Sequence, residues 1–299
     1  LAFFIAQVHN GKHQNFLHTE HTMSIFTAKP NLKKSLAILA LAPLVLTGCV
    51  STASDGENGE VNLINNGVLT VCTNTPYMPF EYEENGKIVG IDADIANAIA
   101  KDLGAEAQLT SISFEGLDSG TGLTSGQCDI ALAGISVTDE RKSKMEFTDV
   151  YFEDNQAILV PKNSKISSVE DLKNAKVGAQ QATSGESYAK EKGADVVQYE
   201  DNELMFSALK TGQVQAVSAN LSVISEALTK DPDSFKIAYQ TSENADQIAG
   251  AVAPEKKALL DKANKTIQQL KSSGELDKIK EKWTKTKSSP SSASSSSAN

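Results

Sequence analysis

The run Cys128-Asp-Ile-Ala-Leu-Ala133 decides the fold class, because it is almost continuously apolar. Such a run is typical of a strand inside a parallel sheet whose two faces are both covered. Outward from it, Val68–Thr73 and Ile248–Ala253 are further strand-like runs. Residues 81–89 carry an Asn-Gly turn between two short segments, which predicts a hairpin.

Strands and helices alternate through the rest of the chain. Asp92 is expected to cap a helix that ends at Gly104. The other predicted strands are 106–112, 176–179, 196–199 and 214–219, and the other predicted helices are 117–124, 184–192, 202–211, 222–230, 255–273 and a last one with Leu276, Ile279 and Trp283 on one stripe. Repeated strand–helix units favour an α/β fold with parallel sheets. Two such sets predict two lobes, and a cleft between α/β lobes is a usual place for a small ligand.

Charge and residue usage exclude several classes of function. The chain has 299 residues and a formal net charge of -10, which disfavours a nucleic-acid binder with a basic face. All four His precede Met23, so a protein translated from Met23 has no His for acid–base catalysis or metal binding. Arg141 is the only Arg. Composition leaves open whether it is incidental, structural, or a planar fork that grips a ligand carboxylate.

The N-terminal region predicts export. Basic residues after Met23 precede the apolar run Leu36–Leu46, which contains Pro43 and is too short to span a bilayer. The run ends in Leu46-Thr-Gly-Cys49, which resembles the lipobox of bacterial lipoproteins, and a buried helix with an incidental Cys is the alternative. We expect residues 1–22 to be untranslated or disordered, 23–48 to be a lipoprotein signal peptide, 49–61 a flexible tether, and 288–299 a disordered Ser-rich tail. A lipid on Cys49 would anchor the exported protein to the outer face of the cell membrane.

Export also changes how the remaining cysteines are interpreted. Lipidation of Cys49 leaves Cys72 and Cys128, and both lie in strand-like runs. An even pair in an oxidising compartment favours one disulfide. Two buried free thiols are the alternative.

Several motifs occur in order along the chain. The most specific is Ala131-Leu-Ala-Gly-Ile-Ser-Val-Thr-Asp-Glu-Arg141, followed by Phe147-Thr-Asp-Val-Tyr151. Before it stand Thr73-Asn-Thr-Pro-Tyr-Met-Pro-Phe-Glu-Tyr82 and Gly90-Ile-Asp-Ala-Asp94, and after it come 176–185 and 274–283. Together they resemble the bacterial extracellular solute-binding proteins for polar amino acids, family 3, over residues 65–285.

The resemblance implies a two-lobed fold of the periplasmic-binding-protein type. Each lobe would be a mainly parallel sheet flanked by helices, and two hinge crossovers would join the lobes. Residues 62–157 and 249–287 would form lobe 1, and residues 158–248 lobe 2. In that fold the first strand lies beside the strand that holds Cys128, which favours the disulfide.

The resemblance also assigns roles in ligand binding. Arg141 would pair with the α-carboxylate of the ligand, helped by the segment that holds Ala133, Gly134 and Ser136. Ser184, at a predicted helix N-terminus, suits the same anion from the other lobe, so that closure holds one carboxylate from both sides.

Three further positions match family sites for the ligand side chain. Tyr77 and Phe114 match positions where the family stacks aromatic rings on the ligand, with ordinary core packing as the alternative. Gln180 matches a position that selects among side chains.

Three residues depart from the family pattern. Asn74 and Asn220 stand where the family often places acids that hold the α-ammonium, and Ala182 replaces a common Gly. Because a buried cation needs a compensating anion, either another carboxylate reaches the cleft or the ligand has no ammonium. We expect the former, with a neutral polar or sulfur-containing amino acid as the ligand.

The sequence thus favours a binding lipoprotein without cofactor that feeds an amino acid to the permease and ATPase of an ABC importer. One alternative is a periplasmic dehydratase on the same fold, with Glu81, Glu115 or Asp118 as its acid. The others are a sensor that reports through a partner and a binder of a carboxylate that is not an amino acid.

Overall fold

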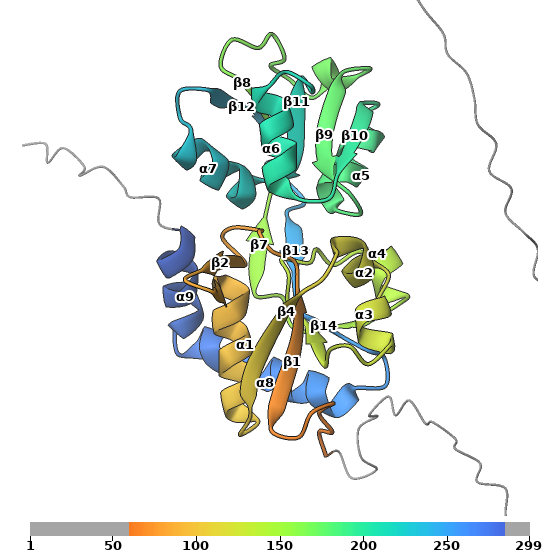
Figure 1. Ribbon diagram of the computed structural model, residues 1–299, viewed down its shortest axis with the longest axis vertical. Coiled ribbons are helices and arrows are strands. Elements are labelled where there is room, and N and C mark those ends of the chain that lie inside the picture. The colour runs from red at the N-terminus through yellow and green to blue at the C-terminus, as the bar shows by residue number, and fades with distance from the viewer. Residues whose placement is uncertain (1–59, 285–299) are drawn as a thin grey trace, which may run out of the picture. The chain divides into compact units, whose positions relative to one another are not determined.

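The computed structural model describes residues 60–284 (Figure 1). The predicted signal peptide, Cys49 and the Ser-rich tail lie outside the described residues, as does most of the predicted tether. Between residues 60 and 284, no helix combines the length and apolar character needed to cross a membrane. This part of the chain forms two five-stranded sheets and two short strand pairs.

The first sheet is mixed. Its strands, in spatial order, are β4 (Glu106–Ser111), β1 (Val68–Thr73), β5 (Ile130–Ala131), β14 (Ala251–Val252) and β6 (Glu146–Phe147). Strand β1 runs parallel to β4 and β5, whereas β14 runs antiparallel to both of its neighbours. The sheet therefore places a strand from near the end of the chain between two strands from its first half.

Helices cover both faces of the first sheet. Ile130 packs into a core shared with α1 (Ile91–Asp102), α8 (Lys257–Ser272) and α9 (Glu275–Thr284). The next residue, Ala131, packs on the opposite side, among residues of α2 (Phe114–Asp118) and α3 (Thr121–Thr124). Burial on both faces explains why this strand reads as a continuous apolar run.

The second sheet is also mixed. Its spatial order is β10 (Asp195–Tyr199), β9 (Lys176–Gln180), β11 (Ala216–Asn220), β8 (Gln156–Pro161) and β12 (Phe235–Gln240). The first three strands are parallel, and β8 runs antiparallel to β11 and β12. Around the sheet lie α5 (Ser184–Glu191), α6 (Asn202–Lys210), α7 (Leu221–Lys230) and the 3-10 turn Glu170–Leu172. The sequence analysis predicts no element at β8, although Ala157–Val160 is fully buried.

Two short strands connect the sheets. Strands β7 (Phe152–Asp154) and β13 (Asp246–Ile248) pair antiparallel, and Figure 1 shows them side by side where the chain passes between the two sheets. The prediction of one strand over 248–253 is wrong, because β13 and β14 are separate. Gly250 stands between them, where a Cβ would lie 2.8 Å from the Leu132 side chain.

The first hairpin and the first helix test two local predictions. The hairpin is confirmed as β2 (Tyr82–Glu84) and β3 (Lys87–Val89), with positive φ at both turn residues, Asn85 and Gly86. The predicted cap of α1 is wrong. Gly90 occupies the N-cap position, where a Cβ would lie 2.1 Å from the Phe80 carbonyl oxygen. Asp92 lies inside the first turn, makes no capping hydrogen bond, and accepts instead from the Gly134 N–H.

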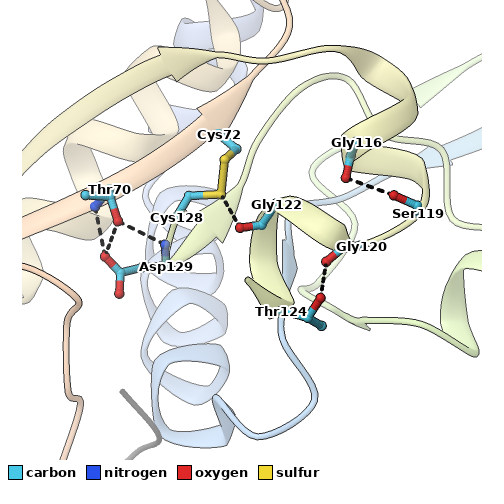
Figure 2. Close-up of a disulfide and its surroundings, with 9 residues drawn as sticks. All are labelled: Thr70, Cys72, Gly116, Ser119, Gly120, Gly122, Thr124, Cys128 and Asp129. Carbon is cyan, nitrogen blue, oxygen red and sulfur yellow. Dashed lines mark hydrogen bonds between the residues drawn. A yellow bond between two sulfur atoms is a disulfide. The ribbon is translucent and has the colours of Figure 1, made fainter. Parts of the chain in front are cut away.

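Two other predicted boundaries change. The helix predicted over 117–124 is interrupted at Gly120, whose φ of 72° ends α2 and starts α3. The strand predicted over 128–133 is ladder-paired only at β5. Cys128 lies just before β5 and forms a disulfide with Cys72 of β1, with a Cα–Cα distance of 5.6 Å (Figure 2).

The carboxylate of Asp129 fixes the chain beside this disulfide (Figure 2). It accepts hydrogen bonds from the backbone N–H of Ile64 and from the N–H and hydroxyl of Thr70. The Lys256 ammonium lies 3.7 Å away. Because Asp129 is fully buried, these donors and the ion pair compensate its charge.

Candidate ligand-binding site

Polar side chains from helices beside both sheets, from the second sheet and from the connecting strand β13 meet around one pocket. The pocket has a volume of about 360 Å³, and its lining includes Arg141, Gln156, Ser184 and Asp246. Arg141 comes from the first-sheet side, Ser184 from α5 beside the second sheet, Gln156 from the start of β8 and Asp246 from β13. A ligand in this pocket would therefore contact α4 (Asp139–Lys142) on the first-sheet side, α5 and β8 on the second-sheet side, and the connecting strand β13.

The Arg141 guanidinium is buried, with 3% of the residue exposed. It lies on α4 (Asp139–Lys142), a single turn capped by the Thr138 hydroxyl, which accepts from the Arg141 N–H. Its Nε donates to Asp118 at 2.8 Å, and its terminal nitrogens donate to the carbonyls of Ser136 at 2.7 Å and Ala182 at 2.8 Å. A guanidinium has five N–H groups, so one N–H on each terminal nitrogen is not used by the described residues and can bind a carboxylate.

Phe114 and Ala182 complete the surroundings of the arginine. The guanidinium carbon lies 5.3 Å from the centre of the Phe114 ring, within the range of a cation–π contact. Ala182 adopts a φ of 63°, in the left-handed region, and its N–H donates to the Glu186 carboxylate at 2.7 Å. Glycine adopts this left-handed backbone without the strain that a Cβ brings.

Asp246 is the centre of a second set of contacts, and the sequence analysis missed it. Its Oδ2 accepts from the Ser136 hydroxyl at 2.8 Å, from Gln156 Nε2 at 2.8 Å and from Asn220 Nδ2 at 3.3 Å. The hydroxyls of Ser136 and Ser184 lie 3.1 Å apart, and Gln156 Nε2 also donates to the Ser184 hydroxyl at 2.9 Å. The structure thus brings Ser136, Ser184 and Asn220 together around a carboxylate.

Tyr77 joins this group through Asn220. The Tyr77 hydroxyl donates to Asn220 Oδ1 at 3.1 Å, and both residues are buried. Burial, followed by the carboxylates of Asp154, Glu81 and Asp246, raises the pKa of Tyr77, so it is a neutral donor. Its ring stacks on Phe80 with centroids 5.8 Å apart, so it serves the core as well as the site.

Asn74 and Gln180 form a separate buried amide pair. Gln180 Nε2 donates to Asn74 Oδ1 at 2.8 Å and to the Glu200 carbonyl at 3.0 Å. Asn74 Nδ2 donates to the Ile112 carbonyl at 2.7 Å. The pair joins the end of β1 to the end of β9 with neutral groups only.

Gly134 is held from behind by a buried acid. Its N–H donates to Asp92 Oδ2 at 2.7 Å, and its φ is 57°. A Cβ at this position would lie 2.7 Å from the Tyr77 ring, so only glycine fits. Burial raises the pKa of Asp92 and of Glu81, which neighbour each other in the core. Ala133 packs in the apolar cluster beside the disulfide.

Of the ten predicted ligand residues, Ala133 packs in the apolar cluster beside the disulfide, and Tyr77 stacks on Phe80 while its hydroxyl contacts Asn220. Arg141 and Ser184 line the pocket. Ser136 and Asn220 donate hydrogen bonds to Asp246, which also lines it. Asn74 and Gln180 contact each other, and Phe114 contacts the arginine. The missed residues are Asp246, on β13, and Gln156, at the start of β8, and neither falls within an element predicted from the sequence.

The chain is similar in sequence to known amino-acid-binding proteins. The chain is 33% identical to the arginine-binding extracellular protein ArtP of Bacillus subtilis (strain 168), over 84% of this chain and 98% of that protein. It is 34% identical to the ABC transporter glutamine-binding protein GlnH of the same organism, over 84% and 96%.

The chain is also similar to solved structures of amino-acid-binding proteins. The amino acid ABC transporter substrate-binding protein AbpA of Streptococcus pneumoniae, bound to L-arginine, has a TM-score of 0.69 at 36% identity, covering 73% of this chain and 95% of that one. The profile of the bacterial extracellular solute-binding proteins, family 3, matches residues 69–286. The chain belongs to the bacterial extracellular solute-binding proteins of family 3.

Proposed function

We propose that this chain is the extracytoplasmic substrate-binding protein of an ABC importer, which captures one amino acid by closure of its two lobes and passes it to a permease and ATPase complex. The observation that carries the proposal is the buried Arg141, whose guanidinium borders a polar pocket and retains two N–H groups. A buried fork of this kind suits a carboxylate, which it binds through two parallel hydrogen bonds.

Closure has a physical cause at the same place. Arg141 contacts the Ala182 carbonyl, and Ser136 contacts Ser184, so each contact joins the first-sheet side to the second-sheet side. A carboxylate that accepts from Arg141 and from Ser184 stabilises the arrangement in which both lie close together.

The ligand side chain is neutral and polar, or contains sulfur. Gln180 lies at a position where the family selects among side chains, and it contacts Asn74 through an amide pair without charge. Gln180 Oε1 is buried and accepts no hydrogen bond from the described residues, so it suits a donor on the ligand. A cationic side chain placed here would meet no carboxylate on these two residues. Glutamine is therefore the first candidate to test, beside arginine and cystine.

The surroundings of Asp118, Glu81 and Glu115 favour ligand binding over catalysis. The three acids considered for an enzyme on this fold are paired, buried in the core, or exposed. Asp118 pairs with Arg141 and lies 3.7 Å from the Lys144 ammonium. Glu81 is buried beside Asp92, and Glu115 is exposed on α2. None is a free acid poised over the pocket.

Membrane anchoring through Cys49 belongs to the same proposal. The lipobox-like Leu46–Cys49 places the lipid ahead of the folded residues, on the outer face of the membrane. Metabolic labelling with a fatty acid tests it, and label retained by Cys49→Ala contradicts it.

Calorimetric titration with the common L-amino acids and L-cystine tests the function. We expect at least one to bind and to be recovered unchanged, as mass spectrometry of the ligand will show. Arg141→Ala should cost about 3–5 kcal/mol of binding free energy, because the ligand carboxylate then enters the pocket unpaired. Arg141→Lys should restore part of the affinity, since a point charge replaces the fork.

The neighbouring Lys142 provides the matched control. It lies on the same helical turn, is exposed, and pairs only with Asp139 among the described residues. Lys142→Ala should leave affinity unchanged. The proposal is contradicted if Arg141→Ala folds and its affinity stays within about threefold of wild type. Such a change in binding free energy is smaller than about 1.4 kcal/mol, which corresponds to tenfold.

A further inference from the structure

We propose that Asp246, on the connecting strand β13, is the anion that holds the α-ammonium of the bound amino acid, with Gln156 as a second acceptor. The inference rests on the proposed function and specifies it further, since it makes the ligand a zwitterion and not merely a carboxylate. It also moves the negative charge away from Asn74 and Asn220, the two positions where the family often places its acids.

The Asp246 carboxylate has only neutral hydrogen-bond donors among the described residues. Its three donors are a serine hydroxyl and two amides, from Ser136, Gln156 and Asn220. No Lys or Arg of residues 60–284 forms an ion pair with it, whereas Asp118 at the same pocket pairs with Arg141. A half-buried carboxylate with neutral donors is stabilised further by a cation.

A second carboxylate increases the demand for a cation. Asp246 lies directly opposite Asp154 in the β7–β13 pair. Burial, the hydrogen bonds to Ser222 and the charge of Asp246 together leave the pKa of Asp154 at about 6, above its ordinary value. Like charges at directly opposed positions of a strand pair are destabilising. An ammonium beside Asp246 offsets that repulsion.

Gln156 supplies an independent observation. The residue is 6% exposed and lines the pocket, and its Oε1 accepts no hydrogen bond from the described residues. Its Nε2 already donates to Asp246 and to the Ser184 hydroxyl. A buried acceptor without a donor is costly, and an ammonium brings donors to it.

Ser136 sets the spacing between the two charged groups. Its carbonyl accepts from Arg141 at 2.7 Å, and its hydroxyl donates to Asp246 at 2.8 Å. One residue therefore links the cation and the anion of the site. The carboxylate and ammonium of an α-amino acid are separated by a single carbon, so one ligand end group matches both partners.

The test uses wild-type protein and Asp246→Asn, which keeps the shape and an acceptor oxygen for Ser136. The probes are the tightest-binding amino acid of the titration panel and its analogue without the α-amino group, glutaramate in the case of L-glutamine. We expect Asp246→Asn to weaken the amino acid by about 100-fold, in the range for truncating a buried charge pair. The analogue should bind the variant no worse than wild type.

Two further variants separate charge from structure. Glu243→Gln removes an exposed charge from the segment just before β13 and should change nothing. Asn220→Asp, added to Asp246→Asn, returns a charge within reach of the same ligand group, because Asn220 Nδ2 lies 3.3 Å from the Asp246 carboxylate. The double variant should recover at least about tenfold in affinity.

The outcomes are distinct. If Asp246→Asn melts like wild type and binds the amino acid within about threefold, or loses the amino acid and its analogue equally, the assignment is wrong while the proposed function stands. Should Asp246→Asn fail to fold, Asp246→Ser takes its place under the same criteria. If no amino acid binds wild type, the proposed function itself fails and this assignment fails with it.

Discussion

Removing the Cys72–Cys128 disulfide should destabilise the folded domain strongly. The bridge closes a chain segment with a sequence separation of 56. In the chain-entropy description, a loop of that size removes about 14 cal/mol/K from the unfolded state, or about 4 kcal/mol at 25 °C. Both residues are buried, so Cys72→Ala with Cys128→Ala also loses some packing in the cluster that holds Ala133 and Phe114. We expect a total loss of about 4–5 kcal/mol in the free energy of unfolding.

Urea unfolding followed by circular dichroism measures this loss. The comparison is between the oxidised protein, the double Ala variant, and wild type in excess reductant, which removes the bridge without changing a side chain. Reduced wild type and the double variant should agree within about 1 kcal/mol, since both lack the same constraint. A double variant and a reduced wild type that both stay within about 1 kcal/mol of the oxidised protein refute the loop-closure reasoning.

Two further changes test local features. Ala182→Gly should stabilise the protein by about 1 kcal/mol, or about 2–4 °C in Tm, because glycine adopts the left-handed backbone without strain. Differential scanning calorimetry measures the change in Tm. As a control, Ala179→Gly in strand β9 should lower Tm instead. Asp154 has a folded pKa of about 6 against an ordinary 3.8, so its protonated form stabilises the fold fully below pH 4 and this contribution is lost as the pH rises through 6. The unfolding free energy of wild type minus that of Asp154→Asn should therefore fall between pH 4 and pH 6, by up to about 3 kcal/mol, and a difference that rises with pH contradicts the burial argument.

Much of the fold is readable from local patterns. Periodicity and turn residues locate β1, the β2–β3 hairpin and the long helix α8, because these elements depend mainly on which residues face a core. The interruption between β13 and β14 is not readable in the same way. At that break a Cβ on residue 250 would lie 2.8 Å from the distant Leu132 side chain, and no local pattern specifies how close Leu132 comes.

In the site as well, local sequence identifies some residues and not others. Arg141 stands in a specific motif, so its sequence context identifies it. Asp246 is one of 38 acidic residues and lies in a polar stretch that looks like an ordinary surface turn. Its importance comes from the pairing of β13 with β7, which places it opposite Asp154 and within reach of Ser136. Tertiary pairing of two short strands has no signature in the spacing of either.

The position of β14 has a consequence for the order in which the chain acquires structure during synthesis and export. Strand β6 pairs only with β14 in its sheet, and β14 is made more than a hundred residues later. Until then the first sheet lacks two of its strands. All five strands of the second sheet lie in the unbroken stretch 156–240, so this sheet can form before β14 of the first sheet has been made. Because the chain emerges from the N-terminus, the second sheet is favoured to be completed before the first.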